Sequence, residues 1–510
     1  MQGLNQAALD ALPPKVQRPV YDRHALQTGI VHLGLGAFMR AHLAVMTEDA
    51  IEAGAGLHWG ICGVSLRSPE TRNALAQQQG LYTLALRDAD GEQLRVIGCV
   101  HECLVAPENP QAVLVRISDP LTRMVSLTVT EKGYHRDPVH GGLDLSDADI
   151  VHDLQTPQAP RTAIGFIGHG LARRYANGMP PITLMSLDNL PANGDTLCRL
   201  ILDFARQLDP VLAQWIAAQC TFPNSMVDRI VPRTTDADRH AINAGLGQRD
   251  AWPVVAERFG DWAIEDRFAA GRPRWQAHGA RFVSRAAPWE QLKLRMVNGA
   301  HSTIAYLALA AGWPTVDAAM AQPDLRSTIE ALLRDEIEPT LAPQLADAST
   351  QGTPTFDMTH YRLQLLHRFA NPALAHRCAQ IAMDGSQKLP QRLMAPLRDR
   401  LTLGQPITLL ALAVAAWLHH LRGHNDEGAG HDINDPLRDA LQTLHQQSLR
   451  FANDTDRAVF FTHFAPVFGD LAGNDVLVSA LAPWLTTLRE QGARVALQRL
   501  ANNLRPLHAA

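Results

Sequence analysis

Three polar residues interrupt the otherwise apolar segment EQLKLRMVNGAHSTIAYLALAAGW, residues 290–313. Lys293, Asn298 and His301 fall at roughly 0°, 140° and 80° on an α-helical wheel, which predicts that they share one face. A lysine can exchange protons near neutral pH when desolvation lowers its pKa. An asparagine or a histidine can donate a hydrogen bond to an oxygen that gains negative charge. The segment therefore predicts proton-transfer chemistry at a hydroxyl or carbonyl group.

The same spacing also fits a polar cluster that only stabilises the fold. Glu290 lies about one helical turn before Lys293, where the two side chains can form an ion pair. Such a pair would keep the lysine protonated, unless Glu290 instead passes protons to solvent. The spacing alone leaves both interpretations open.

A second candidate site is the stretch GLGAFMRAH, which follows a β-rich run. Two glycines, Gly34 and Gly36, allow a tight turn that brings a pyrophosphate close to a helix N-terminus. Met39 stands where the usual dinucleotide motif has a third glycine. The stretch predicts a nucleotide-binding turn, with a plain tight turn as the alternative. The predicted cofactor contacts in this turn are Gly34, Gly36, Ala37, Phe38, Met39, Arg40, Ala41 and His42.

The choice of cofactor depends on the end of the next strand-like run, WGICGVSL. An acidic residue there would bind the ribose hydroxyls of NAD, but the run continues as Arg67-Ser68. Arg67 could pair with the 2′-phosphate of NADP or be a solvated surface arginine. These residues therefore leave NAD and NADP open.

Two further polar stretches are candidates for substrate contacts. SLDNLPANG places Asn189 at the carboxyl end of a predicted strand, where parallel sheets bind ligands. The alternative for Asn189 is an Asx turn before Pro191. FPNSMVDRIVPRTT contains Asp228 and Arg229, which fit either a structural ion pair or contacts with a substrate.

The histidines and cysteines do not indicate a metal centre. His419, His420, His424 and His431 lie in a Gly-rich polar segment, which we expect to be a solvated loop. The six cysteines lie far apart without CxxC spacing, which predicts reduced, mostly buried thiols.

The order of the predicted elements gives the fold class. Strand-like runs at 29–36, 59–66, 123–131 and 182–189 alternate with helical segments, which predicts a parallel sheet with crossover helices. The run 81–100 alternates around Asp90-Gly91 and predicts an inserted antiparallel hairpin. After about residue 281, Leu and Ala recur at helical spacing. We predict an α/β dinucleotide-binding domain over 1–280 and an all-helical substrate-binding domain over 281–510.

Composition excludes several classes of protein. Of the 510 residues 46% are hydrophobic and 19% charged, with a net charge of −5, as in ordinary soluble proteins. No basic stripe is interleaved with aromatics, which disfavours nucleic-acid binding. The N-terminus lacks export-signal features, and the longest apolar run is shorter than the ~20 residues that span a bilayer. We expect a cytoplasmic protein that binds neither nucleic acid nor membrane.

Six stretches together resemble the polyol-specific long-chain dehydrogenases, the mannitol dehydrogenase family. The resemblance covers about residues 28 to 490, and its most specific element is Lys-x4-Asn-x2-His at Lys293, Asn298 and His301. It implies a Rossmann-type N-terminal domain, an all-helical C-terminal domain and metal-independent hydride transfer between NAD(P) and a small sugar acid or polyol. The six stretches are GLGAFMRAH, SLTVTEKGY, SLDNLPANG, FPNSMVDRIVP, KLRMVNGAHS and DGSQKLP.

The resemblance also implies residue roles. Lys293 would be the general acid/base and His301 would orient the substrate. Asn189 and Asn298 would polarise the reacting oxygen.

The substrate implied by the resemblance is a uronate. The stretches VSLTVTEKGY and TAIGF are closer to the fructuronate reductase branch of the family than to its mannitol branch. Arg368 in HRFANP, Lys388 in DGSQK, or Arg229 could bind the substrate carboxylate. The implied reaction is reduction of fructuronate by NADH to mannonate. The alternatives are oxidation of mannitol or arabinitol and, without catalysis, nucleotide sensing on a dehydrogenase scaffold.

Overall fold

The computed structural model describes residues 2–88, 90–137, 140–341, 343–345, 356–373 and 376–504. The chain forms two compact units, Met1–Glu290 and Gln291–Ala510, called unit 1 and unit 2 below.

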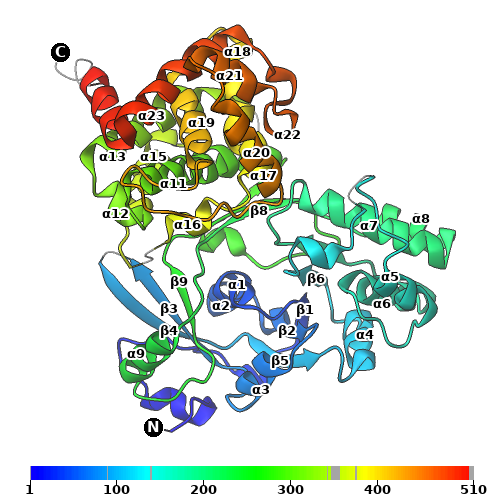
Figure 1. Ribbon diagram of the computed structural model, residues 1–510. Coiled ribbons are helices and arrows are strands. Elements are labelled where there is room, and N and C mark those ends of the chain that lie inside the picture. Colours follow the sequence, from blue (N-terminus) through cyan, green and yellow to red (C-terminus); the bar gives the residue numbers. More distant parts are fainter. Residues whose placement is uncertain are drawn as a thin grey trace. The chain divides into compact units, whose positions relative to one another are not determined.

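Unit 1 is built on a five-stranded parallel sheet with the order β5-β2-β1-β6-β7 (Figure 1). β1, β2, β6 and β7 are buried along their whole length, as expected for a sheet covered on both faces. The strand order reverses between β1 and β6, and ligands of such sheets bind at the carboxyl ends beside this reversal. The predicted parallel sheet is confirmed. Its strands are β1 Thr28–Leu33, β2 Gly60–Ser65, β5 Val100–Val105, β6 Met124–Leu127 and β7 Thr183–Ser186.

The helices of unit 1 connect these strands and cover the sheet. α6 packs closely on α4 and α7, because a Cβ on Gly168 would lie 2.4 Å from Phe204 and one on Gly170 would lie 2.3 Å from Ile117. The first crossover is split at His42, whose backbone is not helical. The helices are α1 Ala37–Ala41, α2 Leu43–Glu52, α3 Glu70–Ala76, α4 Pro110–Ser118, α5 Ala148–Gln155, α6 Ala163–Ala176, α7 Asn193–Leu208, α8 Pro210–Gln219 and α9 Asp236–Leu246.

Two small sheets complete unit 1. β3 Tyr82–Asp88 and β4 Gly91–Ile97 form the predicted antiparallel hairpin, and β9 Val254–Glu257 pairs parallel to β3. β8 Ser225–Asp228, β10 Asp261–Glu265 and β11 Ala280–Val283 form the other sheet, in the order β11-β10-β8. β8 is not among the strands that the sequence predicted, because a four-residue strand shows too few alternations to be recognised.

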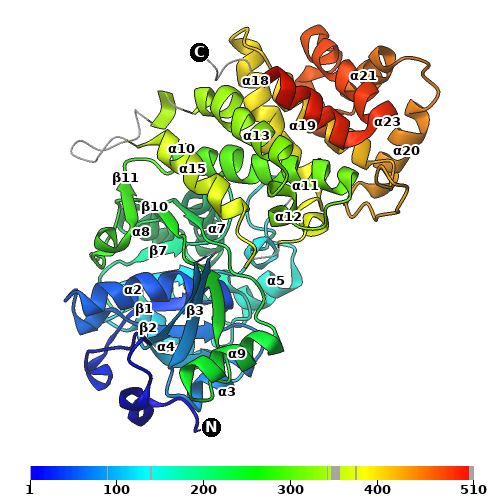
Figure 2. The ribbon, with the colours of Figure 1, turned by 90° about the vertical axis from the view of Figure 1, so that its left-hand side faces the viewer.

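The described part of unit 2 consists of helices and connecting loops, which confirms the predicted helical class (green to red in Figure 2). α19 lies at its centre, since every residue from Leu409 to His420 is buried, and α11 and α23 pack against it. None of the described helices is long and apolar enough to cross a bilayer. The α-helices, beginning with α10 at the boundary between the units, are α10 Ala287–Leu292, α11 Ala300–Ala311, α12 Val316–Met320, α13 Pro323–Ala331, α15 Met358–Phe369, α16 Cys378–Ile381, α17 Gly385–Leu389, α18 Ala395–Thr402, α19 Thr408–His420, α20 Arg438–Ser448, α21 Asp454–Thr462, α22 Ala465–Phe468 and α23 Asp475–Leu504.

Three segments of unit 2 are π-helical: Lys293–Gly299, Leu332–Ile337 and Pro390–Met394. The first packs against the other two. π-Helical turns are rare and frequently occur at functional sites. The sequence predicted an ordinary α-helix over the first segment, so its wheel positions need correction.

Candidate active site

The glycine turn after β1 combines a constrained position with an open one. Gly34 has φ +105°, and a Cβ there would lie 2.1 Å from the carbonyl oxygen of Thr128. Gly36 has φ −92° and is exposed, and the nearest atom to a Cβ there would be 3.8 Å away. The fold therefore requires the first glycine, whereas the second leaves open surface for a ligand.

A buried histidine holds this turn against β6. His32 Nε2 lies 2.9 Å from Thr128 Oγ1, and its Nδ1 lies 2.8 Å from Ser126 Oγ. Since the Thr128 hydroxyl donates to the carbonyl of Gly34 at 3.0 Å, it accepts from Nε2–H, and Nδ1 accepts from Ser126. Burial lowers the pKa of His32 to about 3, so the ring stays neutral at physiological pH. The network fixes the turn at the point where the strand order reverses.

Four of the predicted cofactor residues have buried side chains: Met39, Arg40, Ala41 and His42. The Arg40 guanidinium donates to the carbonyl of Trp252 at 2.6 Å, and the His42 ring lies edge-on to Trp262 at 5.0 Å. These side chains pack within unit 1. The accessible part of the predicted set is Gly34, Gly36, Ala37 and Phe38.

Arg67 lies in the exposed segment just after β2. β2 neighbours β1, so Arg67 follows a carboxyl end on the same edge as the glycine turn. This position fits a contact with a ribose 2′-substituent as well as a solvated arginine.

Asp188 fixes the carboxyl end of β7 to the loop after β6. Its carboxylate accepts hydrogen bonds from the N–H groups of Val129 at 2.9 Å and Thr130 at 3.0 Å, and from the hydroxyl of Tyr134 at 2.8 Å. Burial raises the pKa of this carboxyl from its ordinary value. Asp188 therefore organises the loops around the strand ends.

Asn193, which the sequence analysis did not select, anchors the same strand end from the start of α7. Its Nδ2 donates to the carbonyls of Asp188 at 3.2 Å and Ser225 at 2.9 Å, and its Oδ1 accepts from the N–H of Ser225 at 2.9 Å. The predicted donor Asn189 is exposed and directly follows Asp188. The backbone that carries Asn189 is thus held by the half-buried Asp188 and the buried Asn193.

Asp228 and Arg229 differ in what the structure assigns to them. Asp228 is buried at the end of β8, opposite Asp261 of β10. The Arg229 guanidinium donates to three backbone carbonyls, those of Ala41, Arg258 and Phe259. These bonds tie the end of α1 to the β8–β10 sheet, so Arg229 has a structural role in unit 1.

In unit 2, the π-helical geometry aligns the three residues of the Lys-x4-Asn-x2-His motif. A π-helix joins residues i and i+5, so Asn298 lies one turn after Lys293, whereas an α-helix would turn it by about 140°. His301 follows one turn later in α11. Lys293 and Asn298 are half-buried and His301 is buried. A Cβ on Gly299 would lie 2.9 Å from the carbonyl oxygen of Arg392, so the two π-helical segments are in close contact.

Aromatic side chains surround His301. Its ring centroid lies 4.4 Å from that of Phe369, at the end of α15, and 5.6 Å from that of His376. Arg368, the predicted carboxylate ligand, precedes Phe369 and is buried. The fold therefore brings HRFANP next to the helix that carries the motif, as the prediction requires.

Lys388, the second predicted carboxylate ligand, lies in α17. Its Nζ donates to the carbonyl of Met383 at 2.6 Å and lies 3.4 Å from the Asp384 carboxylate. Burial, followed by the nearby charge of Arg392, lowers the pKa of the ammonium group. Arg392 was not selected from the sequence, although it follows Lys388 by four residues, the spacing of one helical turn.

The histidine-rich segment differs from the expected solvated loop. His419 and His420 are buried in the last turn of α19. His419 Nε2 lies 3.0 Å from Asp426 Oδ1, and the His420 ring stacks on His431 at 4.3 Å. Within the residues that the structure describes, no three His, Cys, Asp or Glu side chains are grouped as metal ligands. The six cysteines, all described, are free thiols.

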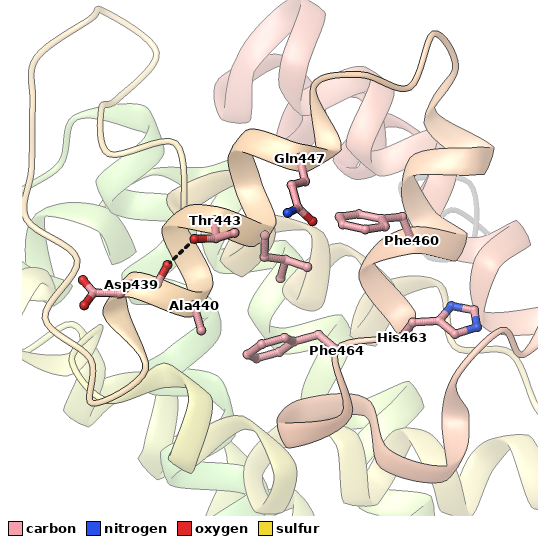
Figure 3. Close-up of a pocket in the computed structure, with 8 residues that line it drawn as sticks. Asp439, Ala440, Thr443, Gln447, Phe460, His463 and Phe464 are labelled. Carbon is pink, nitrogen blue, oxygen red and sulfur yellow. Dashed lines mark hydrogen bonds between the residues drawn. The ribbon is translucent and has the colours of Figure 1, made fainter.

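A groove of about 480 Å³ lies between α20 and α21 (Figure 3). None of the predicted site residues is among the residues that line it. Leu444, Phe460 and Phe464 give it an apolar floor, and the polar groups at its edge come from Asp439, Thr443, Gln447 and His463. Thr443 donates to the backbone carbonyl of Asp439 at 2.8 Å.

Both units match models of a known family. The mannitol dehydrogenase Rossmann domain matches residues 28–277, and the mannitol dehydrogenase C-terminal domain matches residues 285–489. The chain belongs to the mannitol dehydrogenase family. This result confirms the resemblance of the six stretches.

Relatives within the mannitol dehydrogenase family differ in their substrates. The uncharacterized oxidoreductase YeiQ of Escherichia coli (strain K12) is 41% identical over 97% of this chain and 99% of its own length. The D-mannonate oxidoreductase of the same organism is 40% identical over 95% of this chain and 98% of its own. The solved Pseudomonas fluorescens mannitol 2-dehydrogenase, in a ternary complex with NAD and D-mannitol, is 36% identical with a TM-score of 0.80, covering 98% and 100% of the two chains.

Proposed function

We propose that this protein is a nicotinamide-dependent oxidoreductase that reduces D-fructuronate to D-mannonate. The observation that carries this choice is the 40% identity to a D-mannonate oxidoreductase over 95% of the chain. Buried Arg368 and partly buried Lys388 support an anionic substrate, since both are cations in a low-dielectric environment.

The glycine turn fits the pyrophosphate of NAD. Gly36 is exposed, and no atom approaches the position of its Cβ within 3.8 Å, so a phosphate can reach the backbone. We propose Gly34, Gly36, Ala37 and Phe38 as the residues that hold the cofactor. When bound, NADH supplies the hydride that is added to the carbonyl carbon. NADPH is the alternative, with Arg67 as its 2′-phosphate partner.

The motif residues then act on the carbonyl oxygen of the substrate. Lys293, protonated in the reductive direction, donates the proton that converts this oxygen to a hydroxyl, and accepts it in the reverse direction. Asn189 and Asn298 donate hydrogen bonds to the same oxygen as its negative charge develops. His301 orients the neighbouring hydroxyl. This protein's own side chains thus provide the acid and the electrophile without a metal ion.

Oxidation of an uncharged polyol is the second candidate, favoured by the similarity to mannitol 2-dehydrogenase. The test is the rate at which purified protein oxidises NADH or NADPH, followed by absorbance at 340 nm, with fructuronate or fructose as substrate. The same assay with EDTA is the control. We expect a preference for fructuronate that survives EDTA and falls about tenfold to hundredfold in Arg368→Gln, since a charge-assisted hydrogen bond is lost. Equal turnover of fructose by the wild type would favour the polyol function instead.

A further inference from the structure

Arg392 is a partly buried cation beside the motif residues, and it forms no ion pair with the residues that the structure describes. It lies in the π-helical segment Pro390–Met394, which packs against the π-helical segment of Lys293 and Asn298. Its Nη1 donates to Ser302 Oγ at 3.1 Å, and Ser302 directly follows His301 in α11. Among the described residues, no carboxylate forms an ion pair with Arg392, and its Nε and Nη2 have no hydrogen-bond acceptor.

Other arginines in unit 2 show how unusual this is. Three buried ones each engage a carboxylate or a backbone carbonyl: Arg295 with Asp399, Arg362 with Glu338, and Arg400 with the carbonyl of Pro406. The Nε and Nη2 of Arg392 are not among the fully buried atoms without a partner, so solvent or a ligand can reach them. Burial lowers the pKa of Arg392 from its ordinary value, although an arginine stays protonated in proteins.

Arg392 lies near a second cation, Lys388, and near two carboxylates, those of Asp384 and Asp435. Lys388 lies one turn earlier, and the charge of Arg392 contributes to its lowered pKa. The carboxylate of Asp384 lies 3.4 Å from Lys388 Nζ, so it is engaged there. Asp435, the next carboxylate, accepts hydrogen bonds from the N–H and the hydroxyl of Ser386. Each carboxylate is thus bonded to another group, and the Nε and Nη2 edge of Arg392 remains available to an anionic ligand.

We infer that Arg392 binds the carboxylate of a sugar-acid substrate and, together with Arg368, determines selectivity for acids over uncharged sugars. This inference rests on the proposed function and names the group that recognises the acid. The Nη1 bond to Ser302 orients the planar guanidinium, which leaves Nε and Nη2 to donate two parallel hydrogen bonds to a carboxylate. The contact between Gly299 and the Arg392 carbonyl fixes the backbone of Arg392 against the motif segment.

The test compares Arg392→Gln, Arg392→Lys and a matched control, Arg398→Gln. Arg398 lies in α18 and is paired with Asp470 at the surface. Its substitution therefore removes one positive charge from unit 2 but leaves the surroundings of the motif residues unchanged. We measure kcat/KM for fructuronate and for fructose with NADH, and binding of mannonate and of mannitol by calorimetry. We expect Arg392→Gln to lower kcat/KM for fructuronate about tenfold to hundredfold, mainly through KM, with fructose nearly unchanged. Arg392→Lys should restore part of the loss, and Arg398→Gln should show none.

The outcomes separate this inference from the proposed function. Suppose that the wild type prefers fructuronate. If Arg392→Gln keeps that preference, or if its kcat/KM falls equally for fructuronate and fructose, the inference is overturned and the proposed function stands. If the wild type does not prefer fructuronate, the proposed function fails. Calorimetry then tests the inference. Equal affinity of the wild type and Arg392→Gln for mannonate overturns it. Mannonate binding by the wild type but not by Arg392→Gln supports it.

Discussion

The glycine turn of unit 1 and the motif segment of unit 2 differ in the hydrogen-bond partners of their polar side chains. Beneath the turn, buried polar side chains bond one another: His32 bonds Ser126 and Thr128, and Thr128 bonds Gly34. Around the motif, Arg392 has a single hydroxyl partner, Ser302. A satisfied network holds a rigid surface that accepts a ligand through backbone groups, whereas an unsatisfied cation selects a ligand by charge.

The largest expected effect is on the motif side of this comparison. Lys293→Ala should lower kcat by about 10²- to 10⁴-fold, because general acid–base catalysis is lost. The Kd of NADH should stay at the wild-type value, since the proposed cofactor contacts lie in the glycine turn. Stopped-flow turnover and fluorescence titration of NADH measure the two quantities.

Lys15→Ala, which removes an exposed lysine near the N-terminus, is the control and should be fully active. Near-normal turnover of Lys293→Ala at neutral pH would remove Lys293 from the proposed mechanism.

The two glycines of the turn separate a structural role from a ligand-binding one. Gly34→Ala should destabilise the protein by at least about 1–3 kcal/mol, because its φ of +105° and its contact with the Thr128 carbonyl exclude a side chain. Gly36→Ala should unfold like the wild type, since its Cβ has room, but should bind NADH more weakly. Thermal unfolding and NADH titration of both variants distinguish these effects.

Equal loss of stability in the two glycine variants would contradict the assignment. So would full NADH affinity in Gly36→Ala, because the cofactor would then not approach the turn there.

The smallest expected effect comes from two neighbouring carboxyl groups of unit 1 that repel each other when both are charged. Glu48 and Glu52 lie one turn apart in α2. Glu52 is an exposed residue, but partial desolvation of its carboxyl, followed by the charge of Glu48, raises its pKa from 4.5 to about 7. A carboxyl with a raised folded-state pKa contributes stability below pH 4.5 and loses it as pH rises through 7. Glu52→Gln should therefore be more stable than the wild type at pH 8, by about 1 kcal/mol once solvent screening is included, and equally stable at pH 4.5.

Urea unfolding at both pH values measures this difference. Glu70→Gln, which removes an exposed carboxylate from α3, is the control. A gain for Glu52→Gln that is the same at both pH values would show that charge is not the cause.

The sequence predicted the parts of this protein that depend on short-range patterns. Alternating strand and helix runs predicted the parallel sheet, Asp90-Gly91 marked the hairpin, and the resemblance that includes Lys293, Asn298 and His301 indicated the family. These features are visible because periodicity and turn chemistry are local properties of the chain. The four-residue strand β8 was missed for the same reason, since it is too short to show a period.

Only the tertiary structure decided which polar side chains are satisfied. Arg229 and Arg392 look alike in the sequence, yet the first donates to three backbone carbonyls and the second to one hydroxyl. The π-helical turn that aligns Lys293 with Asn298 also depends on packing, because the Pro390–Met394 segment contacts Gly299. Burial and hydrogen-bond partners come from residues far apart in the chain, so no local pattern contains them.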